Sequence, residues 1–220
     1  MPSTVHTVLI TGGGGTLARA TAAAFAAAGW RVHAPGRNAL DVNDPASVAA
    51  FVGALDSLDL LIPCAGLSED RAFPALDAAT WDAVLGANLR GAFLPFHAAL
   101  PLLVRSRGAA LFIGSRVGRR GAAGQSAYAA AKAGLIALAQ TAAREHGADG
   151  VRVNVVLPGF LETRMTAAVP PARRAAVLAE EALGRFNTPE ETARFLVFLA
   201  GMPHTSGQVF QLDSRIDPWI

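Results

Sequence analysis

Tyr128 and Lys132 are four residues apart in an alanine-rich stretch of the 220-residue chain. If this stretch is helical, the two side chains share one face, with their Cβ atoms about 5–6 Å apart. A lysine ammonium at that distance favours the phenolate, so we expect it to lower the tyrosine pKa from its usual value of about 10. The pair would then be able to exchange protons with a substrate near neutral pH.

A serine and a run of glycines make this pair more informative. Ser115 lies thirteen residues before Tyr128 and follows the apolar residues 109–113. Gly12–Gly15 follow an apolar run and precede a helical pattern. Glycine allows a tight turn there, and the free N–H groups of a helix N-terminus attract anions such as a pyrophosphate. Together these features indicate proton transfer beside a bound dinucleotide; the alternatives are a surface pair and a glycine turn that binds nothing.

The composition excludes several classes of protein. The chain is 52% hydrophobic and 16% charged, which excludes disorder, and its net charge of +2 comes without a basic block, which argues against nucleic-acid binding. Cys64 is the single cysteine, so no internal disulfide forms, and a reducing cytoplasm is expected. We expect neither a signal peptide nor a membrane span, since no apolar run reaches about 18 residues. The five histidines are scattered, so no metal site is predicted.

Strand and helix patterns alternate along the chain, which predicts an α/β fold with a parallel sheet and a single domain over residues 1–220. Asp44 is placed to cap the second helix, whereas Pro95 and Pro101 should kink or break the third. Strands are expected at 5–10, 31–34, 58–62, 109–113, 151–157 and 208–212. Helices are expected at 17–28, 45–55, 78–105, 125–146, 171–181 and 189–200.

The chain resembles the short-chain dehydrogenase/reductase family, and within it the 3-oxoacyl-[acyl-carrier-protein] reductases. The likeness runs from Val8 to Asp213. It implies a Rossmann-type, doubly wound parallel sheet with a substrate lid at about 160–185. The motifs that carry it are Thr11-Gly-Gly-Gly-Gly-Thr-Leu17, Asp41-Val42, Cys64-Ala-Gly66, Asn88, Ser115, Tyr128/Lys132, Pro158-Gly-Phe-Leu-Glu-Thr163 and Gly207-Gln-Val-Phe-Gln-Leu-Asp213.

The resemblance implies a catalytic role for four residues. Tyr128 would donate a proton to the alkoxide that forms when a nicotinamide delivers a hydride to a carbonyl carbon. Ser115 would hydrogen-bond the carbonyl oxygen, and Lys132 would lower the Tyr128 pKa and hold the nicotinamide ribose. Asn88 would support a water in the proton relay. The alternatives are a strand-end turn for Ser115 and a local bond to helix backbone for Asn88.

The resemblance also implies a set of cofactor contacts. The family pattern has glycine where this chain has Thr16 and Ala18, and asparagine where it has Cys64, which is more readily explained as a small buried hydrophobe than as a reactive thiol. The implied contacts are Gly12, Gly14, Gly15, Thr16, Leu17, Arg37, Asp41, Val42, Cys64, Ala65, Gly66, Tyr128, Lys132, Pro158, Gly159, Leu161 and Thr163.

Arg37 favours NADP(H) over NAD(H). A carboxylate that would bind the ribose of NAD is replaced by Pro35, and the planar guanidinium of Arg37 follows two residues later. Only residues 35–40 separate the second expected strand from Asp41, too few for a crossover with a helix. We therefore expect a shortened second crossover, any strand at 39–40 to be a stub, and an open adenosine pocket. The alternatives are a solvated Arg37, a turn or cap role for Asp41 and a helix N-cap role for Thr163.

Two classes of function follow from these observations. The first is an NADP(H)-dependent oxidoreductase that interconverts a ketone and a secondary alcohol. Its leading substrate is a 3-oxoacyl thioester, which could be carrier-linked. Another ketone, a sugar or a steroid-like alcohol are the alternative substrates. The second is a non-catalytic dinucleotide-binding sensor or interaction protein on the same fold, which the altered glycine motif, Cys64 and the missing crossover helix favour. The resemblance implies a homo-tetramer or homodimer built on residues 78–105 and 125–146.

Overall fold

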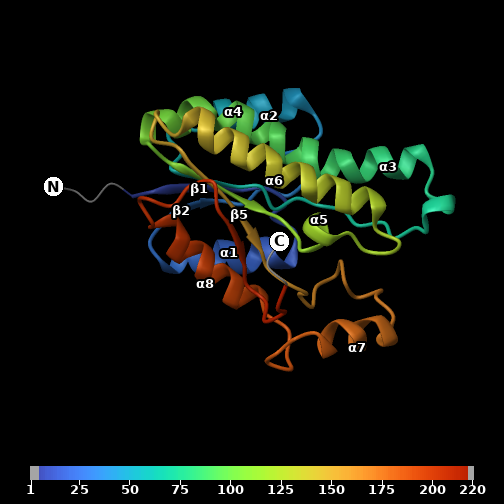
Figure 1. Cartoon of the computed structure of the whole chain (residues 1–220). Helices are drawn as coiled ribbons and strands as arrows, with labels where there is room; N and C mark the ends of the chain where they lie inside the picture. Colours follow the sequence, from blue (N-terminus) through green and yellow to red (C-terminus); the bar gives the residue numbers. More distant parts are fainter. Residues whose placement is uncertain (1–4, 218–220) are drawn as a thin grey trace.

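The computed structural model describes residues 5–217, which form one six-stranded parallel sheet in the order β2-β1-β3-β4-β5-β6. The strand residues of β1, β3 and β4 are all buried, as expected where helices cover both faces of a parallel sheet. The predicted α/β, doubly wound architecture is therefore confirmed (Figure 1). The strands are β1 (Thr7–Ile10), β2 (Arg31–His33), β3 (Leu60–Ile62), β4 (Ala109–Ile113), β5 (Arg152–Leu157) and β6 (Val209–Gln211).

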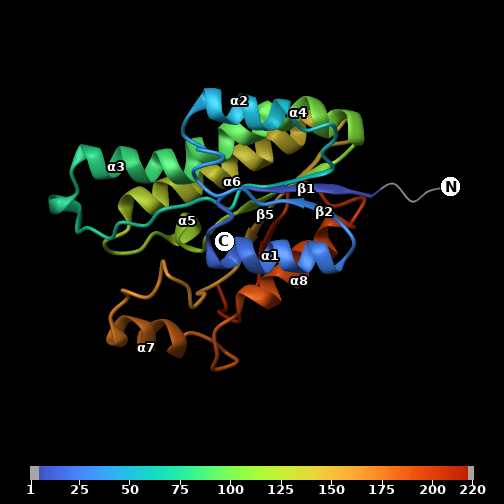
Figure 2. The same cartoon turned by 180° about the vertical axis from the view of Figure 1, so that it is seen from behind.

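Helices cover the two faces of the sheet in separate layers (Figures 1 and 2). On one face lie α1 (Thr16–Ala27) and α8 (Pro189–Ala200); on the other lie α2 (Pro45–Gly53), α4 (Gly91–Ser106) and α6 (Ser126–His146). Alternate strand residues enter opposite cores: Leu111 packs with the α1 and α8 side chains, and Phe112 packs with those of α2, α4 and α6. The period-2 alternation of the strands thus divides the apolar residues between two cores.

The long helix expected at residues 78–105 is divided, but not at its prolines. It consists of α3 (Ala78–Leu85), a π-helical turn η2 (Gly86–Arg90) and α4. Pro95 and Pro101 lie inside α4, so the expectation of a break at either residue was wrong. Burial of Pro95 and other apolar α4 side chains stabilises the helix and outweighs the lost backbone bonds. The π-turn instead changes the helix register, and it carries Asn88.

The second crossover is shortened, as predicted. Residues 34–44 form turns and extended chain, and they lead from β2 directly to α2. The strand stub considered at 39–40 does not form, because Ala39 belongs to a turn and the sheet ends at β2. Leu40 and Val42, which are 2% and 8% exposed, join the core beneath α2 and α4 instead. This segment is therefore anchored by burial and not by strand pairing.

Short elements complete the fold around the carboxyl ends of the strands. These are the 3-10 turn η1 (Phe73–Ala75), α5 (Val117–Arg120) and α7 (Pro171–Ala179). In both views, α7 stands apart from the two helical layers and is joined to them by loop segments on either side (Figures 1 and 2). Asp44 caps α2 as predicted, with its Oδ1 accepting a hydrogen bond from the Ala46 N–H at 3.0 Å. Within residues 5–217, no helix has the length and hydropathy needed to cross a membrane.

Candidate active site

The carboxyl ends of four strands bring the sequence motifs to one edge of the sheet. The glycine turn follows β1, Cys64–Gly66 follow β3, Ser115 follows β4, and Pro158–Thr163 follow β5. The chain passes from β1 to β2 on one side and returns to β3 on the other side of β1, so the winding direction reverses there. In open α/β sheets, ligands bind at such a switch point. Segments far apart in the sequence therefore converge on one site.

Lys132 is a buried charged group at this edge. Its side chain is on α6, is 5% exposed, and donates a hydrogen bond from Nζ to the Ile113 carbonyl at 2.9 Å. Its Nζ also lies 5.5 Å from the centre of the Tyr128 ring, so the two residues share one helix face as predicted. Gly118 allows this arrangement, because a Cβ there would lie 2.6 Å from the Lys132 carbonyl carbon. Close packing of α5 on α6 thus fixes Lys132 at the end of β4.

The pKa of Tyr128 differs from the sequence-based expectation. Burial raises it to about 12, a hydrogen bond with the Ser115 side chain opposes the rise, and the charges of Asp70 and Cys64 add to it. Burial also lowers the pKa of Lys132 to about 8. The expectation that Lys132 pulls the Tyr128 pKa below 10 was therefore wrong for this structure, because desolvation of the phenol dominates. Tyr128 is therefore protonated at neutral pH.

Ser115 connects the end of β4 to Tyr128. Its Oγ accepts a hydrogen bond from the Val117 N–H at 3.3 Å, so the turn role considered from the sequence is present. Its side chain also opposes the rise in the pKa of Tyr128, and both residues line one cavity of about 730 Å³. Apolar lid residues such as Val169 and Val177 form another part of the lining. A carbonyl group entering this cavity would meet two hydroxyl groups.

Asn88 is 1% exposed in the π-turn. Its Nδ2 donates to the Val84 carbonyl at 2.9 Å, which is the local helix bond considered from the sequence, and to the Leu67 carbonyl at 2.6 Å. Its Oδ1 is buried without a hydrogen-bond partner in the described part of the chain. This oxygen faces Gly66, where a Cβ would lie 2.8 Å away. Asn88 therefore joins the helix to the loop after β3 and keeps one acceptor free.

The four glycines of the first turn have different roles. Gly12 has a φ of +69°, and a Cβ at Gly13 would lie 2.0 Å from the Ala34 carbonyl oxygen, so close backbone packing requires both. A Cβ at Gly14 would meet no described atom within 4 Å. Among the described residues, no side chain caps α1 at Gly15. The open surface at Gly14 and the uncapped helix start together fit the phosphates of a dinucleotide.

Thr11 is a supporting residue that the sequence analysis did not single out as a contact. Its Oγ1 accepts hydrogen bonds from the N–H groups of Cys64 and Ala65, at 3.2 and 3.4 Å. It thereby holds the loop after β3 where the family pattern has an asparagine. Burial raises the pKa of Cys64 to about 12, so its thiol is protonated and unreactive at neutral pH. An unreactive thiol agrees with the expected role of Cys64 as a small hydrophobe, and the residue is partly buried.

Arg37 and Asp41 form an exposed pair on the short crossover. The Arg37 side chain is 82% exposed, and its Nε lies 3.4 Å from the Asp41 Oδ2. The Asn43 N–H donates to the Asp41 Oδ1 at 3.0 Å, and this bond and Arg37 hold the Asp41 pKa below its usual value. Asp41 therefore has the turn role considered as an alternative. Its neighbour Val42 is turned into the core, whereas Arg37 remains accessible to a ligand.

The segment after β5 forms a sharp turn and then a series of hydrogen-bonded turns. Gly159 has a φ of +84°, and a Cβ there would lie 2.6 Å from the Asp213 Cβ. Thr163 does not cap a helix, because turns follow it until α7 begins at Pro171. Its N–H donates to the Thr166 Oγ1 at 2.9 Å, and the Thr166 Oγ1 donates to the Leu161 carbonyl at 2.6 Å.

An ion-pair network attaches the lid to the end of β4. Arg116, which directly follows Ser115, pairs with Glu180 after α7 and with Asp217 near the C-terminus, both at 2.7 Å. Arg120 also pairs with Asp217, at 2.8 Å. These residues were not predicted, since partners so distant in the sequence leave no local pattern.

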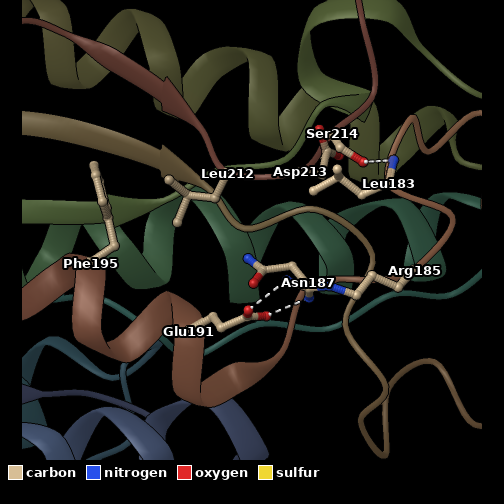
Figure 3. Close-up of a pocket in the computed structure, with 8 residues that line it drawn as sticks. All are labelled: Leu183, Arg185, Asn187, Glu191, Phe195, Leu212, Asp213 and Ser214. Carbon is tan, nitrogen blue, oxygen red and sulfur yellow. Dashed lines mark hydrogen bonds and ion pairs between the residues drawn. The ribbon is translucent and has the colours of Figure 1, made fainter.

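A second, smaller pocket of about 250 Å³ lies at the other end of the lid (Figure 3). Arg185 pairs with Glu191 at 2.9 Å, and Glu191 in turn accepts a hydrogen bond from the Thr188 N–H in the capping box that starts α8. On the opposite side of the pocket, the Leu183 N–H donates to the Ser214 Oγ at 3.1 Å. These contacts fix where the lid ends and α8 begins.

Comparisons with known proteins agree with this architecture. A protein-family model described as Enoyl-(Acyl carrier protein) reductase matches residues 34–214. The 3-oxoacyl-[acyl-carrier-protein] reductase FabG of Thermotoga maritima is 38% identical over 162 residues, which cover 72% of this chain and 66% of that protein. The FabG of Escherichia coli is 37% identical over 166 residues (73% and 68%), and the (3R)-3-hydroxyacyl-CoA dehydrogenase of Homo sapiens is 42% identical over 143 residues (64% and 55%). The chain therefore spans 55% to 68% of the length of these relatives.

Proposed function

Because the chain belongs to the short-chain dehydrogenase/reductase family, we propose that it is an NADP(H)-dependent oxidoreductase that interconverts a ketone and a secondary alcohol. The observation that carries this proposal is the shared cavity wall of Ser115 and Tyr128, with the buried Lys132 behind them. Two hydroxyl donors beside a buried cation suit a reaction in which negative charge develops on a carbonyl oxygen.

Tyr128 acts in this proposal as the general acid for reduction. Its pKa of about 12 keeps the phenol protonated at neutral pH, so it donates its proton to the developing alkoxide. Ser115 donates a hydrogen bond to the same oxygen and orients the carbonyl. When bound, the nicotinamide supplies the hydride for reduction or accepts it for oxidation. Lys132 holds the ribose hydroxyls, and its charge stabilises the phenolate that remains after proton transfer.

The cofactor contacts rest on the open and charged groups at the edge of the sheet. The backbone at Gly14 and the start of α1 holds the diphosphate, because the first N–H groups of a helix have no intrahelical partner and no side chain caps them. Gly15 contacts the diphosphate through its bare Cα, since its own N–H donates to the Gly12 carbonyl at 2.9 Å. Arg37 binds the 2′-phosphate that distinguishes NADP(H) from NAD(H), since its guanidinium is exposed on the short crossover. The remaining contacts are Gly12, Thr16, Leu17, Asp41, Val42, Cys64, Ala65, Gly66, Pro158, Gly159, Leu161 and Thr163.

A 3-oxoacyl thioester is the substrate that we propose to test first. Two relatives are named as a 3-oxoacyl-[acyl-carrier-protein] reductase and a (3R)-3-hydroxyacyl-CoA dehydrogenase. Both names refer to the interconversion of a 3-oxoacyl and a 3-hydroxyacyl group. The cavity of about 730 Å³ with apolar lid residues can accept an acyl chain. We also retain as predictions that the substrate is carrier-linked, that the protein is a homodimer or homotetramer, and that it is cytoplasmic.

The proposal is tested by titrating the protein with NADPH and NADH while following nucleotide fluorescence, and then adding acetoacetyl-CoA. We expect tighter binding of NADPH and a fall in nicotinamide absorbance when the thioester is added. The Tyr128→Phe variant should bind NADPH as before and lose turnover by at least about a hundredfold, the range that one acid–base group contributes. Failure of the unsubstituted protein to bind either nucleotide would refute the proposal.

A non-catalytic dinucleotide sensor is the second candidate. Thr16 and Ala18 replace glycines of the family pattern, and the second crossover lacks its helix, which are changes that catalysis does not require. The same experiment separates the two candidates. A sensor binds nucleotide, shows no oxidation with any carbonyl compound, and is indifferent to Tyr128→Phe.

A further inference from the structure

Arg164 links the lid to the glycine turn. Its Nη2 donates a hydrogen bond to the Gly14 carbonyl oxygen at 3.1 Å, across a sequence separation of 150 residues. The backbone around it is held in place, because the Thr166 N–H donates to the Thr163 carbonyl at 3.2 Å and the Thr163 N–H donates to the Thr166 Oγ1 at 2.9 Å. Arg164 therefore occupies a defined turn with its guanidinium at the glycine surface, although its side chain is exposed.

The charges around Arg164 indicate that an anion belongs beside it. The N-terminus of α1 carries the positive end of the helix dipole, and its first turn contains no acidic residue. A guanidinium at the same place adds a second positive charge, and the two are unfavourable neighbours until an anion lies between them. Glu162, two residues before Arg164, does not neutralise it, because Glu162 pairs with Arg174.

We propose that Arg164 binds the diphosphate of the dinucleotide and so completes from the lid a phosphate site whose other side is the glycine turn. The inference rests on the proposed function. A guanidinium has five N–H donors, and its bond to Gly14 uses one of them, so the others can reach phosphate oxygens. This charged contact compensates for the residues at positions 16 and 18, where the family pattern has glycine.

The same contact joins cofactor binding to the substrate cavity. Met165 and Thr166, which follow Arg164, line the cavity that contains Tyr128. The Met165 Cε lies 3.8 Å from the position of a Cβ at Gly66, so this part of the lid already covers the loop after β3. A diphosphate held by Arg164 therefore keeps the lid over the substrate.

The test compares Arg164→Gln with Arg164→Lys and with Arg173→Gln, a matched control at an exposed arginine of α7 in the same lid. NADPH and NADH affinities are measured by fluorescence, and ADP-ribose by its displacement of NADPH. Loss of one exposed, charge-assisted hydrogen bond should raise Kd about tenfold for all three ligands, since all three contain the diphosphate. Arg164→Lys should recover part of the affinity. Arg173→Gln should leave each Kd unchanged, and Arg37→Gln should weaken the binding of NADPH alone.

Four results would overturn the inference. Unchanged affinity in Arg164→Gln would show that Arg164 touches no phosphate, and tighter binding would show that its side chain obstructs the site. An equal loss in Arg173→Gln would assign the effect to the lid as a whole and not to Arg164. In these three cases the unsubstituted protein still binds NADPH, and the proposed function stands. Absence of nucleotide binding by the unsubstituted protein would remove both the proposed function and this inference.

Discussion

The buried Lys132 predicts how the stability of the protein depends on pH. The residue is 5% exposed and its ammonium donates a hydrogen bond to the Ile113 carbonyl, and burial holds its pKa at about 8 instead of 10.5. Lys132→Met removes the charge with little change in side-chain length. The substitution also leaves the Ile113 carbonyl without this donor, which costs free energy by an amount that does not depend on pH.

The sign and size of the effect follow from proton linkage. Between pH 8 and 10.5 the unfolded chain keeps the Lys132 proton and the folded protein has lost it, so raising the pH favours the folded state. Burying the charged Lys132 ammonium lowers the free energy of unfolding by about 3 kcal/mol below pH 8, and this destabilisation disappears above pH 10.5. From pH 7 to pH 10, the free energy of unfolding of the unsubstituted protein should therefore rise by about 2.5 kcal/mol relative to Lys132→Met.

Equilibrium urea unfolding at pH 7, 8, 9 and 10 measures this difference. Cys64 and Tyr128, whose pKa values are about 12 in the folded protein, also affect stability at high pH, but in the opposite direction. Because both proteins contain them, their contributions largely cancel in the difference between the two proteins. Repeating the comparison in a Cys64→Ala background removes the nearer of the two titrations from the pH range used.

If the difference in the free energy of unfolding between the unsubstituted protein and Lys132→Met stays constant from pH 7 to pH 10, this reasoning is refuted. A constant difference would mean that Lys132 titrates at its ordinary pKa in the folded protein, and therefore that water reaches its Nζ. A difference that falls with pH would mean that an unrecognised anion stabilises the ammonium.

Three further predictions concern the framework of the site. Gly13→Ala should lower the free energy of unfolding by about 3 kcal/mol, because its Cβ would lie 2.0 Å from the Ala34 carbonyl oxygen, whereas Gly14→Ala should leave stability unchanged; urea unfolding of the two variants compares them directly. Thr188→Ala removes the cap of α8 and should cost about 1 kcal/mol, visible as a lower thermal midpoint, and an unchanged midpoint would contradict the cap. Asn88→Ala removes the donor from one buried and one partly buried carbonyl and should lower the free energy of unfolding by about 2 kcal/mol, measured by urea unfolding; Asn88→Asp, which keeps the side-chain volume and loses the donor, should recover none of it.

Much of the fold could be predicted because its signals are local. The apolar runs at 109–113 and 189–200 became β4 and α8 with the predicted bounds, and Asp44 caps α2 as its position before Pro45 indicated. The short second crossover was also predictable, since the number of residues alone excludes a helix there. The division of residues 78–105 was not, because a π-turn depends on how Asn88 packs against the loop after β3.

For the site, the sequence by itself determined the chemical groups and their order along the chain. The helical spacing of Tyr128 and Lys132 placed them on one face, and the glycine turn marked the start of α1, because helix and turn geometry depend on neighbouring residues only. Only the tertiary structure decided how these groups are solvated and which distant residues join them. Burial sets the pKa values of Tyr128 and Lys132 and reverses the expected effect on the phenol, since desolvation depends on every element that packs around a group. The contact of Arg164 with Gly14 likewise required the lid to fold across the carboxyl ends of the strands.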